Sequence, residues 1–457
     1  MYKFGFSGKR LHFIGIGGSG IFPIVQILKD LGYEISGSDM EDSATLKRVR
    51  QLGVKTFVGH DAANITNADM IIYSAAIPKD NPELKKANQE KIPTITRAEA
   101  LGLITAGFQR VVCVAGTHGK TTTSALLTQM LLENDIDTTA IIGGVLPAIG
   151  GSGHLGKSGI CICEACEYAN TFLALQHNIG VVLNVDNDHL ECFGSMDGLI
   201  SAFGKFCSNA KELVIYNGDD KNTQRVATAI PTRKISVGTN PTNDYQAANI
   251  RVLAGNGISF DLLKGGEKII TLTASIPGKH NAINVLAAAV AGLELGLAPW
   301  QLLAPVKNFK GVCRRFEVLY RSGSLTIVDD YAHHPAELKA TLETARQLPH
   351  KNIWAIFQPF TFSRTKRLLA DFVDVLSAAD HCVITDIMGS REFDDLGVSS
   401  EDLVTRLPNA VHKGSFSSAV AYVLENVPED TLVITLGCGN IYHVANKIAQ
   451  KMRGATK

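Results

Sequence analysis

Residues 111–127 read VVCVAGTHGKTTTSALL, and this stretch decides how the middle of the chain folds. It opens with apolar, largely β-branched residues, which are typical of a buried strand. A turn bounded by Gly116 and Gly119 follows, and the apolar spacing after Lys120 is that of a helix. A strand, a glycine-bounded turn and a helix together place backbone N–H groups and a helix N-terminus where they can hold a phosphate.

The turn departs from the pattern G-x-x-x-x-G-K-[ST], because Val114 stands where the first glycine is expected and Gly116 begins a shorter loop. Its parts still suit phosphate. Gly119 exposes backbone donors, Lys120 can reach β- and γ-phosphates, and the hydroxyl of Thr121 can ligate magnesium. We therefore predict a modified P-loop that binds ATP, formed by Gly116, Thr117, His118, Gly119, Lys120, Thr121 and Thr122.

Length and composition set the frame for this site. The chain has 457 residues, of which 45% are hydrophobic, enough for about two to four domains. Its 44 basic and 44 acidic residues cancel, so no overall charge favours nucleic acid or an anionic membrane as partner. The N-terminus lacks the features of a secretory signal, and the most apolar stretch carries Glu294 and is too short to span a bilayer. We expect a soluble, cytoplasmic protein.

Nine cysteines are dispersed along the chain, an odd number that favours reduced thiols over a disulfide framework. Cys161, Cys163 and Cys166 lie close together in GICICEACE and are possible soft metal ligands. Alternation along a strand explains the first two, and no second Cys/His pair follows at a zinc spacing. Buried free thiols are therefore the preferred interpretation.

Strand and helix patterns alternate in three successive blocks, which predicts an α/β fold with three domains in series. The domains are predicted at residues 1–107, 108–312 and 313–457. In the second block the strand signals are VVCVAG, DTTAIIGG, GICICEA, NIGVVLNV and ELVIYNG, before the long apolar helix INVLAAAVAGLELG. We expect a mixed or parallel sheet there.

A second glycine loop, GIGGSG at residues 15–20, follows a predicted strand, and Asp39 closes the next strand. The pattern G-x-G-x-x-G is typical of dinucleotide binding, but the glycines and the helix N-terminus suit any nucleotide diphosphate. A tight turn without a ligand is the alternative. Two phosphate-holding turns in different domains predict two phosphorylated ligands.

Five segments in order, GTHGKTT, NVDNDHL, GKHNAINVLAA, GVCRRFE and DDYAHHPAE, resemble the Mur ligase family over nearly the whole chain. Within the family they resemble the branch that joins L-alanine to UDP-N-acetylmuramate. The resemblance implies an ATP-dependent ligase in cytoplasmic peptidoglycan precursor synthesis, which phosphorylates the muramate carboxylate and lets the amine attack the acyl phosphate. It implies a Rossmann-like N-terminal domain, a central ATP-binding domain with the modified P-loop and a C-terminal Rossmann-like domain. The UDP-sugar residues would be Gly15, Gly17, Gly18, Ser19, Asp39, His60 and Ser74, with Arg97 in similar surroundings.

The resemblance also implies a magnesium site and adenine contacts. Glu164 and His189 are similar to the family's metal ligands and would act with Thr121. Glu167 is a less certain partner, because EACEYANTF departs from the usual family segment. Asn281 and Asn284 would contact the adenine or the ribose, although Asn at a helix start can instead serve as an N-cap.

In the third domain the resemblance assigns catalytic roles to Arg315 on the transferring phosphate and to Asp330 and His333 around the incoming amino acid. Arg364 would clamp the alanine carboxylate. Arg314 and His334 are the alternatives to their neighbours, and Tyr331 lies beside the pair. Phe360 and Thr361 depart from the family pattern, which weakens the account of alanine recognition.

Related ligases carry a lysine that becomes carbamylated, but here Phe203 falls near that place and Lys205 is two residues away. This favours the alanine branch. The alternatives are a murein tripeptide-recycling ligase, a non-catalytic UDP-sugar sensor and a nicotinamide-dependent dehydrogenase. The predicted partners are UDP-N-acetylmuramate and L-alanine, with ATP and Mg²⁺ as cofactors, and the chain is expected to be a monomer or homodimer.

Overall fold

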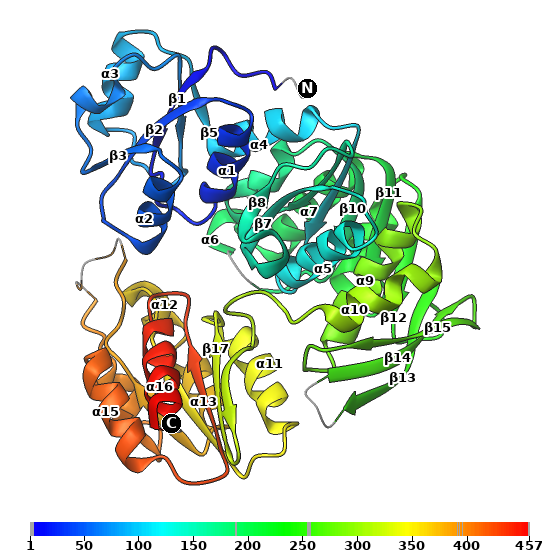
Figure 1. Cartoon of the computed structure of the whole chain (residues 1–457), viewed down its shortest axis with the longest axis vertical. Helices are drawn as coiled ribbons and strands as arrows, with labels where there is room; N and C mark the ends of the chain where they lie inside the picture. Colours follow the sequence, from blue (N-terminus) through cyan, green and yellow to red (C-terminus); the bar gives the residue numbers. More distant parts are fainter. Residues whose placement is uncertain are drawn as a thin grey trace. The chain divides into compact units, whose positions relative to one another are not determined.

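The computed structural model describes residues 4–187, 190–253, 257–390, 392, 394 and 396–455, and its strands form three sheets (Figure 1). The chain divides into two compact units. One extends as far as Asn249 and includes Phe260–Thr273 and Ala282–Phe309, whereas the other holds Ile250–Ser259, Ala274–Asn281 and the chain from Lys310 onward. The first unit contains the first sheet and most of the second, and the second unit contains the third sheet. With one sheet for each predicted domain, the predicted three-domain α/β architecture is confirmed.

The first sheet has the order β3-β2-β1-β4-β5 with parallel pairing throughout, as in half of a Rossmann fold. Its strands are β1 (Arg10–Ile14), β2 (Glu34–Asp39), β3 (Lys55–Val58), β4 (Met70–Tyr73) and β5 (Thr94–Thr96). The connecting helices are α1 (Phe22–Asp30), α2 (Ala44–Gln51), η1 (Ala62–Ile65), α3 (Pro82–Gln89) and α4 (Arg97–Ala106). The carboxyl ends of parallel strands share one edge, so the loop after β1 and the residue that ends β2 lie close together.

The second sheet has the order β15-β14-β13-β12-β11-β10-β6-β9-β7-β8. Pairing is parallel from β13 to β7, and β8 is antiparallel to β7, so the sheet is mixed, which is one of the two arrangements predicted. Its strands are β6 (Arg110–Ala115), β7 (Thr139–Leu146), β8 (Gly151–His154), β9 (Ile160–Glu164), β10 (His177–Val182), β11 (Ala210–Asn217), β12 (Lys234–Gly238), β13 (Tyr245–Leu253), β14 (Gly257–Lys264) and β15 (Glu267–Ala274).

The helices between these strands are α5 (Lys120–Leu132), η2 (Pro147–Ile149), η3 (Tyr168–Ala174), α6 (Leu190–Phe193), α7 (Met196–Ser208), α8 (Lys221–Ala229), α9 (Asn281–Glu294), η4 (Pro299–Leu302) and α10 (Leu303–Asn308). Sequence analysis missed β12 to β15. In the second half of β13 exposed positions alternate with half-buried ones, and much of β15 is partly exposed, so these two strands lack the strong apolar pattern of β6 and β9.

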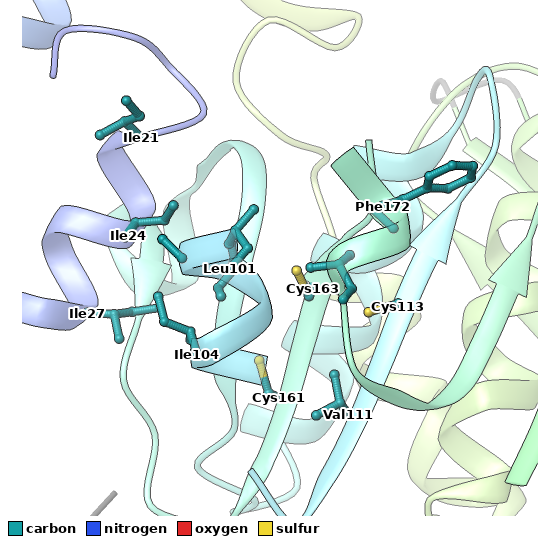
Figure 2. Close-up of a cluster of buried hydrophobic side chains, with 14 of the residues drawn as sticks. Ile21, Ile24, Ile27, Leu101, Ile104, Val111, Cys113, Cys161, Cys163 and Phe172 are labelled. Carbon is teal, nitrogen blue, oxygen red and sulfur yellow. The ribbon is translucent and has the colours of Figure 1, made fainter. Parts of the chain in front are cut away.

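One hydrophobic core runs from the first sheet's helices into the second sheet (Figure 2). Ile24 of α1 and Ile104 of α4 belong to the same buried cluster as Val111 of β6 and Cys161 of β9. Polar contacts reinforce this packing, because Oε1 of Gln26 accepts hydrogen bonds from the backbone N–H groups of Ser152 and Gly153, at 3.3 and 2.9 Å. The predicted boundary at 107/108 lies between α4 and β6, but the core continues across it.

The third sheet has the order β16-β17-β21-β18-β19-β20, with β16 antiparallel to β17 and the other pairs parallel. Its strands are β16 (Glu317–Ser322), β17 (Leu325–Asp330), β18 (Asn352–Phe357), β19 (His381–Ile384), β20 (Ala410–His412) and β21 (Thr431–Leu436). Its helices are α11 (Pro335–Arg346), α12 (Phe362–Arg367), α13 (Leu369–Leu376), α14 (Glu401–Val404), α15 (Phe416–Asn426) and α16 (Tyr442–Ala455).

Both faces of the third sheet are covered. Along β18, Ile353, Ala355 and Phe357 enter one core together with side chains of α11, α13 and α14. Trp354 and Ile356 enter the other core, which α15 and α16 complete. When both faces of a parallel sheet are buried, polar side chains that bind a ligand are found at the carboxyl ends of its strands.

The cysteines are free thiols, and Cys113, Cys161 and Cys163 are buried side by side on β6 and β9. Within the described part of the chain, no group of three or more His, Cys, Asp or Glu side chains is arranged to hold a metal ion. Among the same residues no helix has the length and apolar character needed to cross a bilayer.

His177 at the start of β10 is a buried titratable group in the core of the second sheet. His177 is 1% exposed, and its ring stacks on that of Phe206 with the two centroids 4.5 Å apart. Burial lowers the pKa of His177 from 6.5 to about 4, although a hydrogen bond with the carbonyl of Leu175 opposes this. The folded chain therefore holds the neutral ring.

We predict that the unfolding free energy falls as pH is lowered from 6.5 to 4, because the unfolded histidine takes up a proton that the folded one excludes. The contribution of this one group is about 3 kcal/mol. Urea unfolding followed across this pH range should show a weaker pH dependence in His177→Phe, which keeps an aromatic ring on Phe206. An unchanged pH dependence would contradict the assignment.

Candidate functional site

The P-loop predicted from sequence lies at the carboxyl end of β6, between Gly116 and α5. Gly116 has φ 141° and Gly119, the residue before α5, has φ 83°, values that L side chains rarely adopt. A Cβ on Gly116 would lie 3.2 Å from the backbone nitrogen of Asn184, and one on Gly119 would collide with Oδ1 of Asn284. Backbone conformation and space therefore both require glycine at these two positions.

The segment after β10 holds this loop in shape. Oδ1 of Asn184 accepts a hydrogen bond from the N–H of His118 at 2.7 Å, and Nδ2 of Asn184 donates to the carbonyl of His118 at 3.1 Å. The N–H of Asp186 donates to Oγ1 of Thr117 at 2.9 Å. Sequence analysis assigned no role to Asn184. The available signal was its position just after a strand that pairs with β6.

Lys120 begins α5, and its ammonium lies inside the loop. Nζ donates to the carbonyls of Gly116 and Thr117 at 2.5 and 3.0 Å, and it lies 3.1 and 3.0 Å from the two carboxylate oxygens of Glu167. The side chains are 14% and 4% exposed. Burial opposes the charge on Lys120, but Glu167, then Cys166 and Glu164, raise its pKa above the usual value. The lysine is therefore a fixed cation.

Glu164 ends β9 directly opposite Val114 of β6, so its carboxylate lies at the same sheet edge as the P-loop. Its Oε2 accepts a hydrogen bond from the N–H of Gly143 at 2.8 Å. Thr121 is 3% exposed in the first turn of α5, and Thr122 follows it. The other predicted metal ligand, His189, lies outside the described residues.

The two predicted adenine contacts lie at the start of α9. Asn284 is 7% exposed, and its carboxamide oxygen faces the backbone of Gly119. Nδ2 of Asn281 donates to the carbonyl of Pro277 at 2.6 Å. The structure thus places Asn284 against the P-loop within the first compact unit.

The first glycine loop is fixed by the end of β2. The N–H groups of Gly15 and Ile16 donate to the carbonyl of Ser38, and the N–H of Gly17 donates to Oδ2 of Asp39 at 2.8 Å. Gly15 has φ 85°, and a Cβ there would lie 3.3 Å from Cβ of Ser74. Gly18 and Ser19 are exposed beyond these contacts. The predicted loop residues Gly15, Gly17, Gly18, Ser19, Asp39 and Ser74 are therefore brought together.

His60 belongs to a buried polar network on the opposite side of β2. Its Nδ1 lies 2.9 Å from Oγ of Ser38, which donates to Oε2 of Glu83 at 2.7 Å. Nε2 of His12 lies 3.2 Å from the same carboxylate oxygen. Burial raises the pKa of Glu83, but hydrogen bonds from His12, Asn64 and Ser38 outweigh it and leave the pKa below its usual value. His60 is therefore linked through Ser38, the neighbour of Asp39 on β2, to the buried carboxylate of Glu83.

Arg97, the first residue of α4, lies close to both the first glycine loop and the middle domain. A Cβ on Gly20 would lie 2.9 Å from Nη1 of Arg97. The positive charge of Arg97 also lowers the pKa of Cys166, although burial and Glu167 leave that pKa raised overall. The residue before the helix, Thr96, forms a capping box with Glu99 and fixes the start of α4.

In the second compact unit, the predicted catalytic residues gather at the carboxyl edge of the third sheet. Asp330 ends β17 and accepts hydrogen bonds from the N–H groups of Phe316 and Ala332, each at 2.7 Å. Burial raises the pKa of Asp330 to about 6, although the charge of Arg315 opposes this. Burial lowers the pKa of His333 despite Glu337, and Arg364 and Arg315 lower it further. Arg315, Asp330, His333 and Arg364 are therefore electrostatic neighbours.

Arg314, the alternative to Arg315, is engaged in the interior. Its Nε lies 3.0 Å from Oδ2 of Asp329, and its other nitrogens donate to the carbonyls of Gly439 and Gly437 at 2.9 and 2.5 Å. Asp329 is 1% exposed. Arg314 thus ties the start of this unit to the loop after β21, which favours Arg315 as the residue that meets a ligand.

His334, the alternative to His333, precedes α11 and leads into its first turn. Oε2 of Glu337 accepts hydrogen bonds from the N–H groups of His333 and His334 at 3.0 and 3.3 Å. The ring of His333 faces Tyr331 edge to face, with centroids 5.5 Å apart, and lies 6.5 Å from the ring of Phe360. Thr361 has φ 64° just before α12, the helix that carries Arg364.

Family models match all three parts of the chain. Residues 10–109 match the Mur ligase family catalytic domain, residues 114–292 the Mur ligase middle domain, and residues 314–439 the Mur ligase glutamate ligase domain. The chain is 42% identical to the UDP-N-acetylmuramate–L-alanine ligase of Caldanaerobacter subterraneus subsp. tengcongensis, over 97% of this chain and 98% of that protein. The same-named ligase of Alkaliphilus metalliredigens is 38% identical, over 96% and 97% of the two chains.

Solved structures agree with this relationship. The UDP-N-acetylmuramate-alanine ligase of Thermotoga maritima is similar with a TM-score of 0.85 at 26% identity, covering 98% of this chain and 99% of that one. A murein peptide ligase from Psychrobacter arcticus has a TM-score of 0.73 at 20% identity, covering 97% and 98% of the two chains, which shows the shared fold. The ordered motifs, the fixed P-loop and these matches lead to one conclusion: the chain belongs to the Mur ligase family.

Proposed function

We propose that this protein is an ATP-dependent ligase that joins L-alanine to UDP-N-acetylmuramate in peptidoglycan precursor synthesis. The observation that carries the proposal is the nearly full-length match to relatives named for this activity. The geometry supports it, because the compact unit that contains the P-loop also contains a second, differently built glycine loop. Two loops of this kind suit a reaction with two phosphorylated ligands.

The chemistry requires strong neutralisation of negative charge. A carboxylate that attacks ATP brings two anions together, and fixed cations lower the cost of that approach. Lys120 supplies one such cation, because its ammonium is oriented by two carbonyls and by Glu167. The acyl phosphate that forms loses its phosphate when the amine of L-alanine attacks the carbonyl carbon.

Magnesium fits the donors on this sheet edge. The hydroxyl of Thr121 and the carboxylate of Glu164 are hard oxygen ligands of the kind Mg²⁺ prefers. Thr121 lies in the helix that follows β6, Glu164 ends β9, and these two strands pair in the second sheet. We include His189 in the proposed metal site on the family resemblance. The ion would supply charge neutralisation between ATP and the attacking carboxylate.

The remaining proposed residues are assigned to the nucleotide, the UDP-sugar and the amino acid. Asn281 and Asn284 are proposed to contact the adenine or ribose, and the first glycine loop, with His60 behind it, to hold the UDP-sugar. In the C-terminal domain, Arg315 is proposed for the transferring phosphate. Arg364 is proposed for the alanine carboxylate, since a forked guanidinium pairs with both carboxylate oxygens. Asp330 and His333 are proposed to orient the incoming amino acid and ATP; His333 is an electrostatic neighbour of Arg364, and Asp330 is one of Arg315.

We predict that the purified protein with Mg²⁺ and UDP-N-acetylmuramate releases ADP when L-alanine is present. Glycine and L-serine should support slower release, because a methyl group or hydroxyl is worth only about 1–3 kcal/mol in such a pocket. A coupled ADP assay and mass spectrometry of the product would measure this. Preference for the preformed tripeptide would assign the recycling reaction instead, and no ADP release with any amine would refute ligase activity.

We predict that Lys120→Ala lowers kcat at least 100-fold, because the fixed cation at the transferring phosphate is lost. Binding of UDP-N-acetylmuramate, measured by calorimetry, should remain within about twofold of wild type, since Lys120 lies in the other glycine loop. Equal loss of UDP-sugar binding would contradict the division of labour between the loops.

We predict that Glu167→Gln lowers kcat about tenfold, because a neutral amide no longer holds the Lys120 ammonium by charge. The KM for UDP-N-acetylmuramate should be unchanged, and Glu167→Asp should recover part of the loss. Glu133→Gln is the matched control, since Glu133 is exposed at the far end of α5 and accepts hydrogen bonds from Gln129 and Asn308. Wild-type kcat in Glu167→Gln would show that the ion pair has no role in positioning.

A further inference from the structure

A buried carboxylate that has no part in the proposed reaction lies in the first domain. Glu83, in the first turn of α3, is 0% exposed, yet hydrogen-bond donors surround it. Nδ2 of Asn64 and the N–H of Asp61 donate to its Oε1 at 2.7 and 3.3 Å. The hydroxyl of Ser38 donates to Oε2 at 2.7 Å, and Nε2 of His12 lies 3.2 Å from the same oxygen.

These donors keep Glu83 ionised. Burial by itself raises the pKa of Glu83, but the hydrogen bonds outweigh burial and leave the pKa below its usual value. An ionised carboxylate has no proton and only accepts hydrogen bonds. Glu83 therefore determines the direction in which each neighbouring group donates.

The hydroxyl of Ser38 transmits this direction to His60. A serine hydroxyl carries one proton, and Ser38 donates it to Glu83. Nδ1 of His60 lies 2.9 Å from the same hydroxyl oxygen, which can now only accept, so Nδ1 carries a proton. In a neutral imidazole the other nitrogen then has a free lone pair. The two contacts thus select the tautomer of His60 in which Nε2 is an acceptor.

His60 and the first glycine loop share Ser38 as their anchor. The carbonyl of Ser38 accepts hydrogen bonds from the N–H groups of Gly15 and Ile16 at 2.8 and 3.0 Å. The side chain of His60 is 9% exposed, and among the hydrogen bonds of the described residues none engages its Nε2. Ser38 therefore holds the loop through its carbonyl and His60 through its hydroxyl, which leaves Nε2 as the free polar atom of the ring.

We propose that Glu83 is a positioning residue for the UDP-sugar: through Ser38 it keeps Nε2 of His60 as an acceptor for an N–H or O–H group of this ligand. The inference rests on the proposed function, and Glu83 itself does not touch the ligand. The glycine loop offers N–H donors to phosphate, whereas Nε2 in this tautomer pairs only with a donor. Two donors that face each other would both stay unsatisfied. The proton order of the network therefore sets the affinity for the UDP-sugar.

The substitution Glu83→Gln reverses the proton order and keeps the shape of the side chain. The N–H of Asp61 only donates, and Nδ2 of Asn64 also donates to a backbone carbonyl, so the new amide oxygen must face these two donors. The amide NH₂ then faces Ser38, whose hydroxyl accepts from it and turns its own proton toward His60. His60 is forced into the other tautomer, with a donor at Nε2.

The reversed network remains fully bonded, so the variant is expected to fold. Nε2 of His12 faces the side chain at position 83, and Nδ1 of His12 lies 2.9 Å from the hydroxyl of Ser36. In its other tautomer His12 accepts from the new amide and donates to Ser36. The reversal therefore leaves no buried donor of these two histidines facing another donor inside the domain.

The first test is ¹⁵N NMR of the histidine side chains in the ligand-free, full-length protein at about pH 8, where an ordinary histidine is neutral. We expect the proton of His60 on Nδ1 in wild type and on Nε2 in Glu83→Gln. The spectrum of His60→Asn identifies the signals of His60. The same tautomer in wild type and in Glu83→Gln would overturn the inference.

Asp69→Asn is the matched control, because it also replaces a hydrogen-bonded acid of the first domain by its amide. Asp69 pairs with Arg10 and accepts a hydrogen bond from the N–H of Lys9, so it belongs to a different set of contacts from Glu83. This variant should keep the wild-type tautomer of His60 and the wild-type kinetic constants.

The second test is steady-state kinetics. In Glu83→Gln the KM for UDP-N-acetylmuramate should rise about tenfold, because a donor of His60 now faces a donor of the ligand. The KM for ATP and kcat at saturating UDP-sugar should stay at their wild-type values. Ser38→Ala removes the connecting hydroxyl but keeps the carbonyl that holds the loop. In that background Glu83→Gln should have no further effect on the KM for UDP-N-acetylmuramate.

The kinetic outcomes separate this role from a purely structural one. A reversed tautomer with an unchanged KM for the UDP-sugar would overturn the inference. An equal effect of Glu83→Gln with and without the hydroxyl of Ser38 would also overturn it, as would a parallel loss of kcat and of ATP affinity. A wild-type protein that does not ligate would refute the proposed function alone, since NMR and calorimetric binding of the UDP-sugar are measured without the reaction.

Discussion

The ion pair between Lys120 and Glu167 is the interaction on which the middle domain's site depends. A buried ammonium is costly unless an opposite charge and hydrogen-bond acceptors surround it. Here Glu167 and the carbonyls of Gly116 and Thr117 provide both. The loop must therefore keep a conformation in which two successive carbonyls turn inward, which only glycines at 116 and 119 allow. One electrostatic requirement thus fixes the backbone that presents donors to phosphate.

The same requirement links distant parts of the chain. Glu167 lies on the segment after β9, Asn184 follows β10, and Asn284 lies on α9, yet all three contact the loop or its lysine. Each comes from an element that is packed into a buried core. The loop is therefore held from several sides by buried parts of the chain. Removing any one contact is expected to loosen the others, which is the behaviour of a connected polar network.

Local patterns in the sequence predicted the parts of the structure that depend on local chemistry. The strand, the glycines and Lys120 of residues 111–127 lie where the spacing put them, and so does Asp39 beside the first loop. Asp330, which the family resemblance singled out, ends β17. The resemblance to a family supplied the choice of Arg315 over Arg314, and the interior contacts of Arg314 give that choice a physical reason. Contacts between segments far apart in sequence were not predictable. The hydrophobic periodicity of the sequence does not indicate that Asn184 hydrogen-bonds to His118 or that Glu167 pairs with Lys120. Nor does it indicate that His60 is connected to Glu83 through the hydroxyl of Ser38.

The continuous core across the boundary between α4 and β6 has a consequence for how such ligases diversify. Leu101 and Ile104 on one side and Val111 and Cys161 on the other are buried together, so neither segment has a complete interior of its own. Exchange of the N-terminal segment between relatives would pair two surfaces that never co-evolved, leaving voids or clashes at their junction. The segments that carry the two glycine loops are therefore expected to tolerate exchange only together, whereas the third sheet, which has two cores of its own, is expected to tolerate separate exchange.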